Sequence, residues 1–148
     1  KIVGSVDVYK DSLYTAPGAK IVLVSYADEV EDVLNAAKLL GAENIPCDVY
    51  KLVKIFPFTE ELIREIMRYN VVLMAEECVA CGGLESIWLA LQHAGWNGRY
   101  IHTAVEQLCL PHATVPQIKQ VTGLDAEHLA QAVREAVQAP EAKGEAKV

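Results

Sequence analysis

Residues 71–91 read VVLMAEECVACGGLESIWLAL, and this stretch decides the fold. Its first four residues form a continuous apolar run, which is typical of a central strand covered on both faces. Glu76 and Glu77 follow where that strand is expected to end. Gly82 and Gly83 then allow a close turn into an apolar helix that packs against the sheet. The stretch therefore predicts a buried strand, a loop and a helix in succession.

Strand-like and helix-like patterns alternate about four times along the chain. The strand-like segments are residues 20–25, 46–56, 71–76 and 99–105, and the helix-like ones are 28–41, 59–67, 83–94 and 123–137. Alternation of this kind implies right-handed crossovers, a mostly parallel sheet and helices on both of its faces. We therefore expect an α/β protein with three α/β/α layers and a mostly parallel sheet of roughly five strands.

Side chains that favour helix ends stand at several of these boundaries. Asp28 with Glu31 fits a capping box, and Gly41 is expected to end the first helix. Thr59 and Asp125 are the expected N-caps of two later helices.

A length of 148 residues fits one domain with a single core. Residues 1–19 are expected to form an incoming linker or edge strand, and residues 20–137 the domain itself. Residues 138–148 are polar and interrupted by Pro and Gly, which predicts a disordered tail. The chain starts without Met and enters strand-like sequence at once, so we expect it to be part of a longer protein.

Charge and cysteine content restrict the partners and the compartment. A net charge of -7 and an isoelectric point near 5.0 argue against binding to nucleic acid or to an anionic membrane. No apolar run approaches the ~20 residues that a membrane span needs. Four unevenly spaced cysteines do not form a secreted disulfide framework. We therefore expect a cytoplasmic protein.

Glu76 and Glu77 are candidate functional residues because they end the predicted central strand. Adjacent strand residues point to opposite faces, so the two carboxylates cannot share one proton directly. At least one of them should face the crevice where open sheets hold ligands or partners. The alternative is an ordinary solvated or helix-capping carboxylate.

The loop after this strand offers two weaker candidates. Gly82 and Gly83 could hold an anion through free amides at a helix start, or could simply allow close packing of the helix on the sheet. Cys78 and Cys81 form a CxxC motif that could bind metal or act in redox chemistry. No second pair with matching spacing is present, and the alternative is two small residues in a tight loop.

The four histidines differ in their surroundings. His112 follows Pro111 in a predicted loop, where functional histidines commonly lie. His93 and His128 are expected on helix surfaces, and His102 is expected to be a core histidine with a satisfied partner. No nucleophile elbow, P-loop, dinucleotide fingerprint, H-E-x-x-H or thiamine-diphosphate motif is present. We therefore predict no catalytic residue and no cofactor site in this chain.

Two stretches resemble a known family. Residues 71–91 resemble the C-terminal domain of transketolase-like, thiamine-diphosphate-dependent enzymes, in which an acidic pair precedes a Gly-Gly helix start. Residues 109–137 read CLPHATVPQIKQVTGLDAEHLAQAVREAV. They resemble the corresponding stretch of the 1-deoxy-D-xylulose-5-phosphate synthase family, which contains a Pro-His loop and, further on, a GLDA-type helix start. That family usually has Gly after the histidine, where this chain has Ala113.

The resemblance, which extends over residues 20–137, implies a parent transferase that condenses pyruvate with D-glyceraldehyde 3-phosphate and releases CO2. It implies a homodimer that uses thiamine diphosphate and magnesium, bound by its other domains, for isoprenoid and thiamine biosynthesis. This chain would then be an accessory domain that packs on the pyrimidine-binding domain and is inactive alone.

Other readings of the residues stay open. The chain could be the same domain of a transketolase or of a 2-oxo acid dehydrogenase beta subunit. It could also be a stand-alone anion-binding module, or a CxxC metal or redox protein.

Overall fold

A computed structural model describes residues 11–79, 81–106 and 112–139. Within these residues, one sheet holds five strands in the order β1-β3-β2-β4-β5. The strands are β1 (Asp11–Tyr14), β2 (Ile21–Ser25), β3 (Cys47–Lys51), β4 (Val71–Val79) and β5 (Arg99–Val105). All neighbours pair in parallel except β1, which runs antiparallel to β3 at one edge. The predicted mostly parallel sheet of roughly five strands is confirmed.

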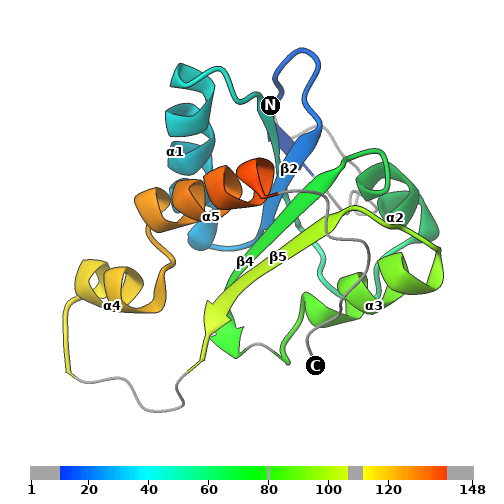
Figure 1. Cartoon of the computed structure of the whole chain (residues 1–148). Coiled ribbons are helices and arrows are strands. Elements are labelled where there is room, and N and C mark those ends of the chain that lie inside the picture. Colours follow the sequence, from blue (N-terminus) through cyan, green and yellow to red (C-terminus); the bar gives the residue numbers. More distant parts are fainter. Residues whose placement is uncertain (1–10, 80, 107–111, 140–148) are drawn as a thin grey trace.

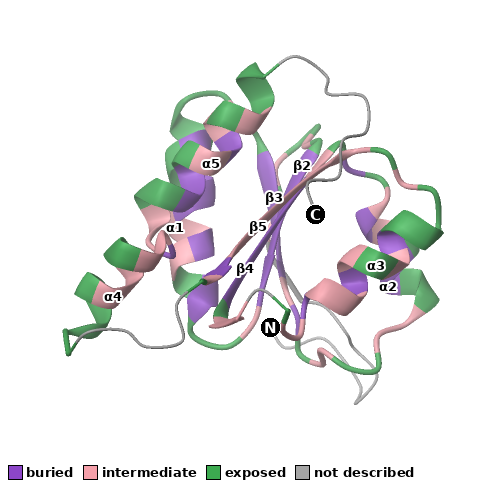
Figure 2. Cartoon of the chain, turned by 60° about the horizontal axis from the view of Figure 1, so that its bottom comes forward, coloured by how far each residue is buried: buried purple, intermediate pink, exposed green. Residues whose placement is uncertain are grey.

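Helices cover both faces of this sheet, as predicted. They are α1 (Glu29–Ala42), α2 (Glu60–Ile66), α3 (Glu85–His93), α4 (Val115–Thr122) and α5 (Ala126–Gln138). α1 and α5 lie on one face, and α2 and α3 lie on the other (Figure 1). Figure 2 shows the resulting three layers, with α4 on the same side as α1 and α5. None of the helices in the described ranges has the length and apolarity for a membrane crossing.

The sheet separates two apolar cores, and β4 contributes to both. Leu73 and Ala75 pack with α1 and α5, whereas Val72 and Met74 pack with α2 and α3. This division follows from the alternation of side chains along a strand. It explains why the predicted strand reads as a continuous apolar run rather than as an alternating one.

Two of the three predicted helix caps are confirmed. The Thr59 hydroxyl accepts a hydrogen bond from the amide of Leu62 at 3.3 Å. Asp125 accepts from the amides of Glu127 and His128 at 3.1 and 3.2 Å.

The capping box at Asp28 is wrong, because this side chain makes no cap hydrogen bond. Asp28 has helical dihedral angles (φ -77°, ψ -20°), whereas a capping side chain needs an extended residue. The first helix also continues past Gly41 to Ala42, and Asn44 takes the left-handed conformation (φ 62°) beyond it.

The last predicted helix, residues 123–137, is α5, and α4 before it is a helix that the sequence pattern did not predict. Gly123 adopts φ 74° and ends α4, as glycine commonly does after a helix, and α5 begins at Ala126. The strand predicted over 46–56 ends at Lys51, and α3 begins at Glu85, two residues later than predicted.

The predicted domain bounds are not tested by the fold. Residues 1–10 and 140–148, most of the predicted linker and tail, lie outside the described residues. The edge strand itself is β1, and the bounds 20–137 stay a prediction.

Candidate functional site

The carboxyl end of β4 carries the two candidate glutamates, and they point to opposite sides of the sheet. Glu76 is fully buried and contacts the start of α3. The side chain of Glu77 is 48% exposed and contacts α4 through Lys119. The two carboxylates therefore belong to two separate clusters, as strand alternation requires.

Glu76 is held by three donors from three separate segments of the chain. His102 Nε2, from β5, lies 2.8 Å from Glu76 Oε1. The Tyr26 hydroxyl donates to Oε2 at 3.1 Å, and the Leu84 amide at the start of α3 lies 3.4 Å from both oxygens. A buried carboxylate without partners is strongly destabilising, and this arrangement supplies them. We call Glu76, Tyr26, Leu84 and His102 the Glu76 cluster.

Aromatic side chains surround the Glu76 carboxylate. Burial, and then the Glu76 carboxylate, raise the pKa of Tyr26, so its hydroxyl stays a donor at neutral pH. Tyr100 stacks on Trp88 with ring centroids 4.2 Å apart and also contacts the His102 ring. His102 is thus a mostly buried histidine with a partner, as its position in the sequence predicts.

Lys119 of α4 forms the second cluster, which joins three elements through one ammonium group. Its Nζ lies 2.6 Å from Asp32 Oδ2 and 3.0 Å from Glu29 Oε2 on α1, and 3.3 Å from Glu77 Oε1 on β4. Burial lowers the pKa of Lys119, but the hydrogen bonds and charges of Asp32 and Glu29 outweigh it and raise that pKa above its usual range. We call these four residues the Lys119 cluster.

Glu29 is the least satisfied member of the Lys119 cluster. Its side chain is 1% exposed, and its contact with Lys119 is an ion pair in which neither Glu29 oxygen accepts a well-formed hydrogen bond. Burial raises the pKa of Glu29 to about 7, and Lys119 lowers it only in part. The ionised form of Glu29 is therefore disfavoured by the fold.

Replacing Glu29 with Gln should stabilise the protein above neutral pH. The folded state binds the Glu29 proton more tightly than the unfolded chain, whose pKa is near 4.5, so wild-type stability falls as pH rises from 4.5 through about 7. We expect Glu29→Gln to raise the free energy of unfolding by about 2 kcal/mol near pH 8 and to change it little near pH 4. Urea unfolding at both pH values measures this.

The matched control is Glu31→Gln, which removes the same charge from an exposed position on α1. It should shift stability by no more than about 0.5 kcal/mol at either pH. A Glu29→Gln variant that is less stable than the wild type at pH 8 would contradict the raised pKa.

The glycines and cysteines lie in the loop between β4 and α3. A methyl group on Gly82 would lie 2.7 Å from the Val79 carbonyl and 2.8 Å from Cys78 Sγ, so this position requires glycine for close packing. Cys78 and Cys81 are free thiols, and no group of three His, Cys, Asp or Glu that could hold a metal occurs within residues 11–79, 81–106 and 112–139. Anion binding at Gly82 and Gly83, and chemistry at the two cysteines, stay predictions.

His112 belongs to neither the Glu76 cluster nor the Lys119 cluster. It is exposed in the segment before α4, and within the described part of the chain it makes no hydrogen bond or ion pair with Glu76 or Glu77. Its proposed role at an interdomain or active-site surface stays a prediction. The structure adds Tyr26 and Lys119, which no local motif indicates.

Several solved transketolases share this arrangement of layers and strands. The structure described as "Split gene transketolase, inactive beta4 tetramer" matches with a TM-score of 0.76 and 26% identity, covering 86% of this chain and 42% of that one. Transketolase from Campylobacter jejuni matches with a TM-score of 0.67 and 14% identity, covering 90% of this chain and 20% of that one. The second likeness supports the fold alone.

The chain belongs to the transketolase C-terminal domain family, because the model of "Transketolase, C-terminal domain" matches residues 11–129. The 1-deoxy-D-xylulose-5-phosphate synthase of Thermotoga petrophila is 30% identical over 104 residues, 68% of this chain and 17% of the relative. The same enzyme of Parabacteroides distasonis is 26% identical over 119 residues, 79% and 19% of the two chains.

A relative with a different activity also matches. The pyruvate dehydrogenase E1 component subunit beta of Chlorokybus atmophyticus is 31% identical over 75 residues, half of this chain and 22% of the relative. This chain therefore spans about a fifth of the length of the relatives that it matches.

Proposed function

We propose that this chain is the C-terminal accessory domain of a 1-deoxy-D-xylulose-5-phosphate synthase. The observation that supports this proposal best is its similarity to such synthases over 68% to 80% of its length. The Pro-His loop and the GLDA-type helix start in residues 109–137 also favour the synthase over its relatives. The parent would condense pyruvate with D-glyceraldehyde 3-phosphate and release CO2.

In this proposal the thiamine diphosphate and magnesium of the parent are held by its other domains. When bound, the cofactor supplies the carbanion chemistry, and the protein supplies binding and orientation. Two candidate positions among the described residues do not fit the cofactor: Glu76 is engaged by its own three donors, and Cys78 and Val79 already fill the space beside Gly82. No step of the reaction is therefore assigned to this chain.

The role that remains is structural, and the surface of the chain supports it. Several large apolar side chains are exposed on this surface, as expected if a neighbouring domain covers them in the parent. Phe56, which follows β3, is 74% exposed. The others include Val53, Leu89, Val115 and Val121. We propose that the partners are the remaining domains of the parent and, through them, a second copy of the parent.

The parent reaction can be tested on native protein captured with an antibody against this chain. We expect release of labelled CO2 from carboxyl-labelled pyruvate only when D-glyceraldehyde 3-phosphate is also present. CO2 release without the aldehyde would indicate a 2-oxo acid dehydrogenase. Transfer of a two-carbon unit between sugar phosphates without CO2 would indicate a transketolase.

The second candidate is the C-terminal domain of a split-gene transketolase subunit, and the likeness at a TM-score of 0.76 favours it. The length of the captured polypeptide separates the two candidates. A synthase is expected at about 600 residues, because 104 aligned residues are 17% of the Thermotoga enzyme. A split subunit is expected at about 300 residues, because 86% of this chain covers 42% of that one.

A titration of the isolated chain tests its accessory role. Calorimetry with thiamine diphosphate and magnesium should show no binding heat while circular dichroism shows a folded chain. Saturable micromolar binding would overturn the accessory role, and Gly82 and Gly83 would be the first positions to substitute.

A further inference from the structure

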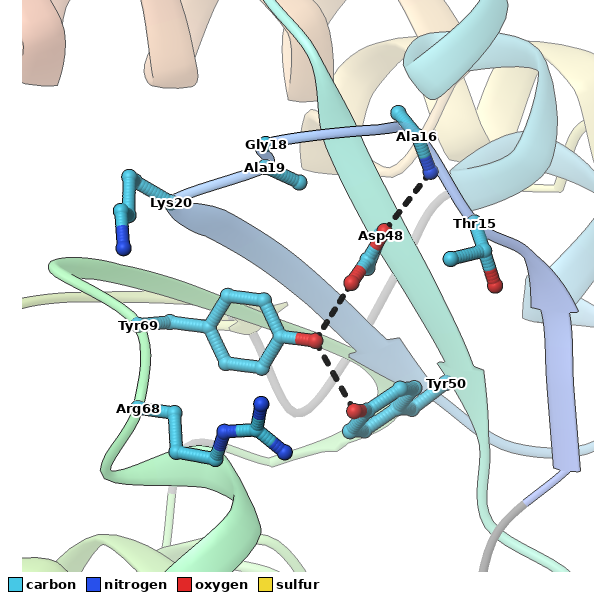
Figure 3. Close-up of a pocket in the computed structure, with 9 residues that line it drawn as sticks. All are labelled: Thr15, Ala16, Gly18, Ala19, Lys20, Asp48, Tyr50, Arg68 and Tyr69. Atoms are coloured by element: carbon cyan, nitrogen blue, oxygen red, sulfur yellow. Dashed lines mark hydrogen bonds between the residues drawn. The ribbon is translucent and has the colours of Figure 1, made fainter.

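A polar pocket lies at the amino ends of the parallel strands, at the edge of the sheet opposite Glu76. Its volume is about 440 Å³. Lys20 precedes β2, Asp48 and Tyr50 lie on β3, and Arg68 and Tyr69 precede β4 (Figure 3). We call these five residues the amino-edge pocket. Open sheets hold their usual ligands at the other edge, so neither the fold nor the proposed function accounts for this pocket.

The floor of the pocket is a chain of hydrogen bonds that ends on a buried carboxylate. Asp48 Oδ1 accepts from the Ala16 amide at 2.8 Å, and Oδ2 accepts from the Tyr69 hydroxyl at 2.5 Å. Because the Tyr69 proton is directed to Asp48, the Tyr50 hydroxyl donates to the Tyr69 oxygen across 2.9 Å. The two rings meet edge to face at 5.9 Å.

This floor is fixed before any ligand arrives. Asp48, Tyr50 and Tyr69 are all buried, and burial, with Asp48 next, raises the pKa of Tyr69. Both carboxylate oxygens of Asp48 are engaged within the fold, so the carboxylate is not directed at the opening. The side chains of Tyr50 and Tyr69 line the pocket beside this carboxylate.

The rim carries two cations. Lys20 and Arg68 are both exposed, and within the described residues neither forms an ion pair with a carboxylate. The pocket residues carry two positive charges and one negative charge, although the whole chain has a net charge of -7. A guanidinium and an ammonium that line the same pocket suit an oxyanion, because the guanidinium can donate two parallel hydrogen bonds.

We propose that the amino-edge pocket binds a small molecule that carries one oxyanion, either a phosphate monoester or a carboxylate. The oxyanion lies between Lys20 and Arg68 at the rim, and the uncharged body of the molecule lies against the phenols of Tyr50 and Tyr69. The proposal holds whichever parent enzyme the chain belongs to, because it uses only residues of this chain.

Nuclear magnetic resonance titration of the whole chain with inorganic phosphate, acetate and glycerol 3-phosphate tests this. We expect saturable binding of at least one of these probes, with amide shifts at residues 18–20, 48 and 68–69. Tighter binding of phosphate than of acetate identifies a phosphate site, and the reverse order identifies a carboxylate site. Glycerol 3-phosphate should bind more tightly than inorganic phosphate if the floor holds the body of the ligand.

Three variants give the test its control. Lys20→Gln and Arg68→Gln should each weaken binding about tenfold, the usual loss when a charged hydrogen bond is removed. Arg64→Gln removes the same charge one helical turn earlier, outside the pocket, and should leave binding unchanged. No saturable binding of any probe, or equal weakening by all three variants, would overturn the proposal. All three positions are exposed, so the variants should fold, and circular dichroism verifies this.

Discussion

Replacing Glu76 with Ala is expected to lower the free energy of unfolding by about 3 kcal/mol or more. The substitution removes the acceptor shared by His102 Nε2, the Tyr26 hydroxyl and the Leu84 amide, and it leaves these donors in an apolar surrounding. It also releases the start of α3, which Glu76 holds against the end of β4. Denaturant unfolding followed by circular dichroism measures the loss.

The neighbouring residue supplies the control. Glu77→Ala removes an identical side chain that is 48% exposed, and exposed ion pairs contribute only about 0.2–1 kcal/mol. Glu76→Gln should fall between the two, because the amide keeps one acceptor oxygen. If Glu76→Ala and Glu77→Ala lower the free energy of unfolding by the same amount, the Glu76 cluster makes no specific contribution to the stability of the fold.

Leu73→Ala is expected to cost about 3–4 kcal/mol, within the range for large-to-small substitutions in a packed core. Leu73 is fully buried on the α1 and α5 face of β4. Both tryptophans of the chain, Trp88 and Trp96, pack on the opposite face. Because β4 belongs to both cores, the variant should unfold in one transition. Tryptophan fluorescence and far-ultraviolet circular dichroism should therefore give the same denaturant midpoint, lower than that of the wild type.

A control for Leu73→Ala is Val121→Ala on the exposed face of α4, which should change stability by less than about 0.5 kcal/mol. If the fluorescence midpoint of Leu73→Ala stays at the wild-type value while the dichroism midpoint falls, the two cores unfold separately. That result would contradict the single cooperative domain expected for a chain of this size.

The sequence predicts the three layers and the mostly parallel sheet, because apolar periodicity is a local signal that separates strands from helices. It does not predict the order of the strands in the sheet. It predicts that Glu76 and Glu77 face opposite ways, because this needs only the two-residue repeat of a strand. It does not identify their partners. His102 reaches Glu76 because β5 pairs with β4 in the register that sets Met74 opposite His102.

Other features of the structure could not be predicted from the sequence, mostly because they depend on contacts between distant segments. Lys119 meets Glu29 and Asp32 only after α4 packs beside α1, and no spacing in the sequence indicates that contact. The capping box at Asp28 has the right residues, but the backbone of Asp28 is helical rather than extended. Residue types alone do not indicate which of these two backbone conformations Asp28 adopts. The amino-edge pocket is likewise assembled from strand β3 and the segments that precede β2 and β4.

The buried acids at the two edges of the sheet have a consequence for how such a domain can change during evolution. Asp48 at one edge and Glu76 at the other each satisfy donors that come from another strand or loop. A substitution of either acid leaves its donors without an acceptor, and a substitution of Tyr69 or His102 leaves the acid without a donor. Each acid and its ring partner should therefore be inherited as a pair, and lineages that lose one member should lose the other.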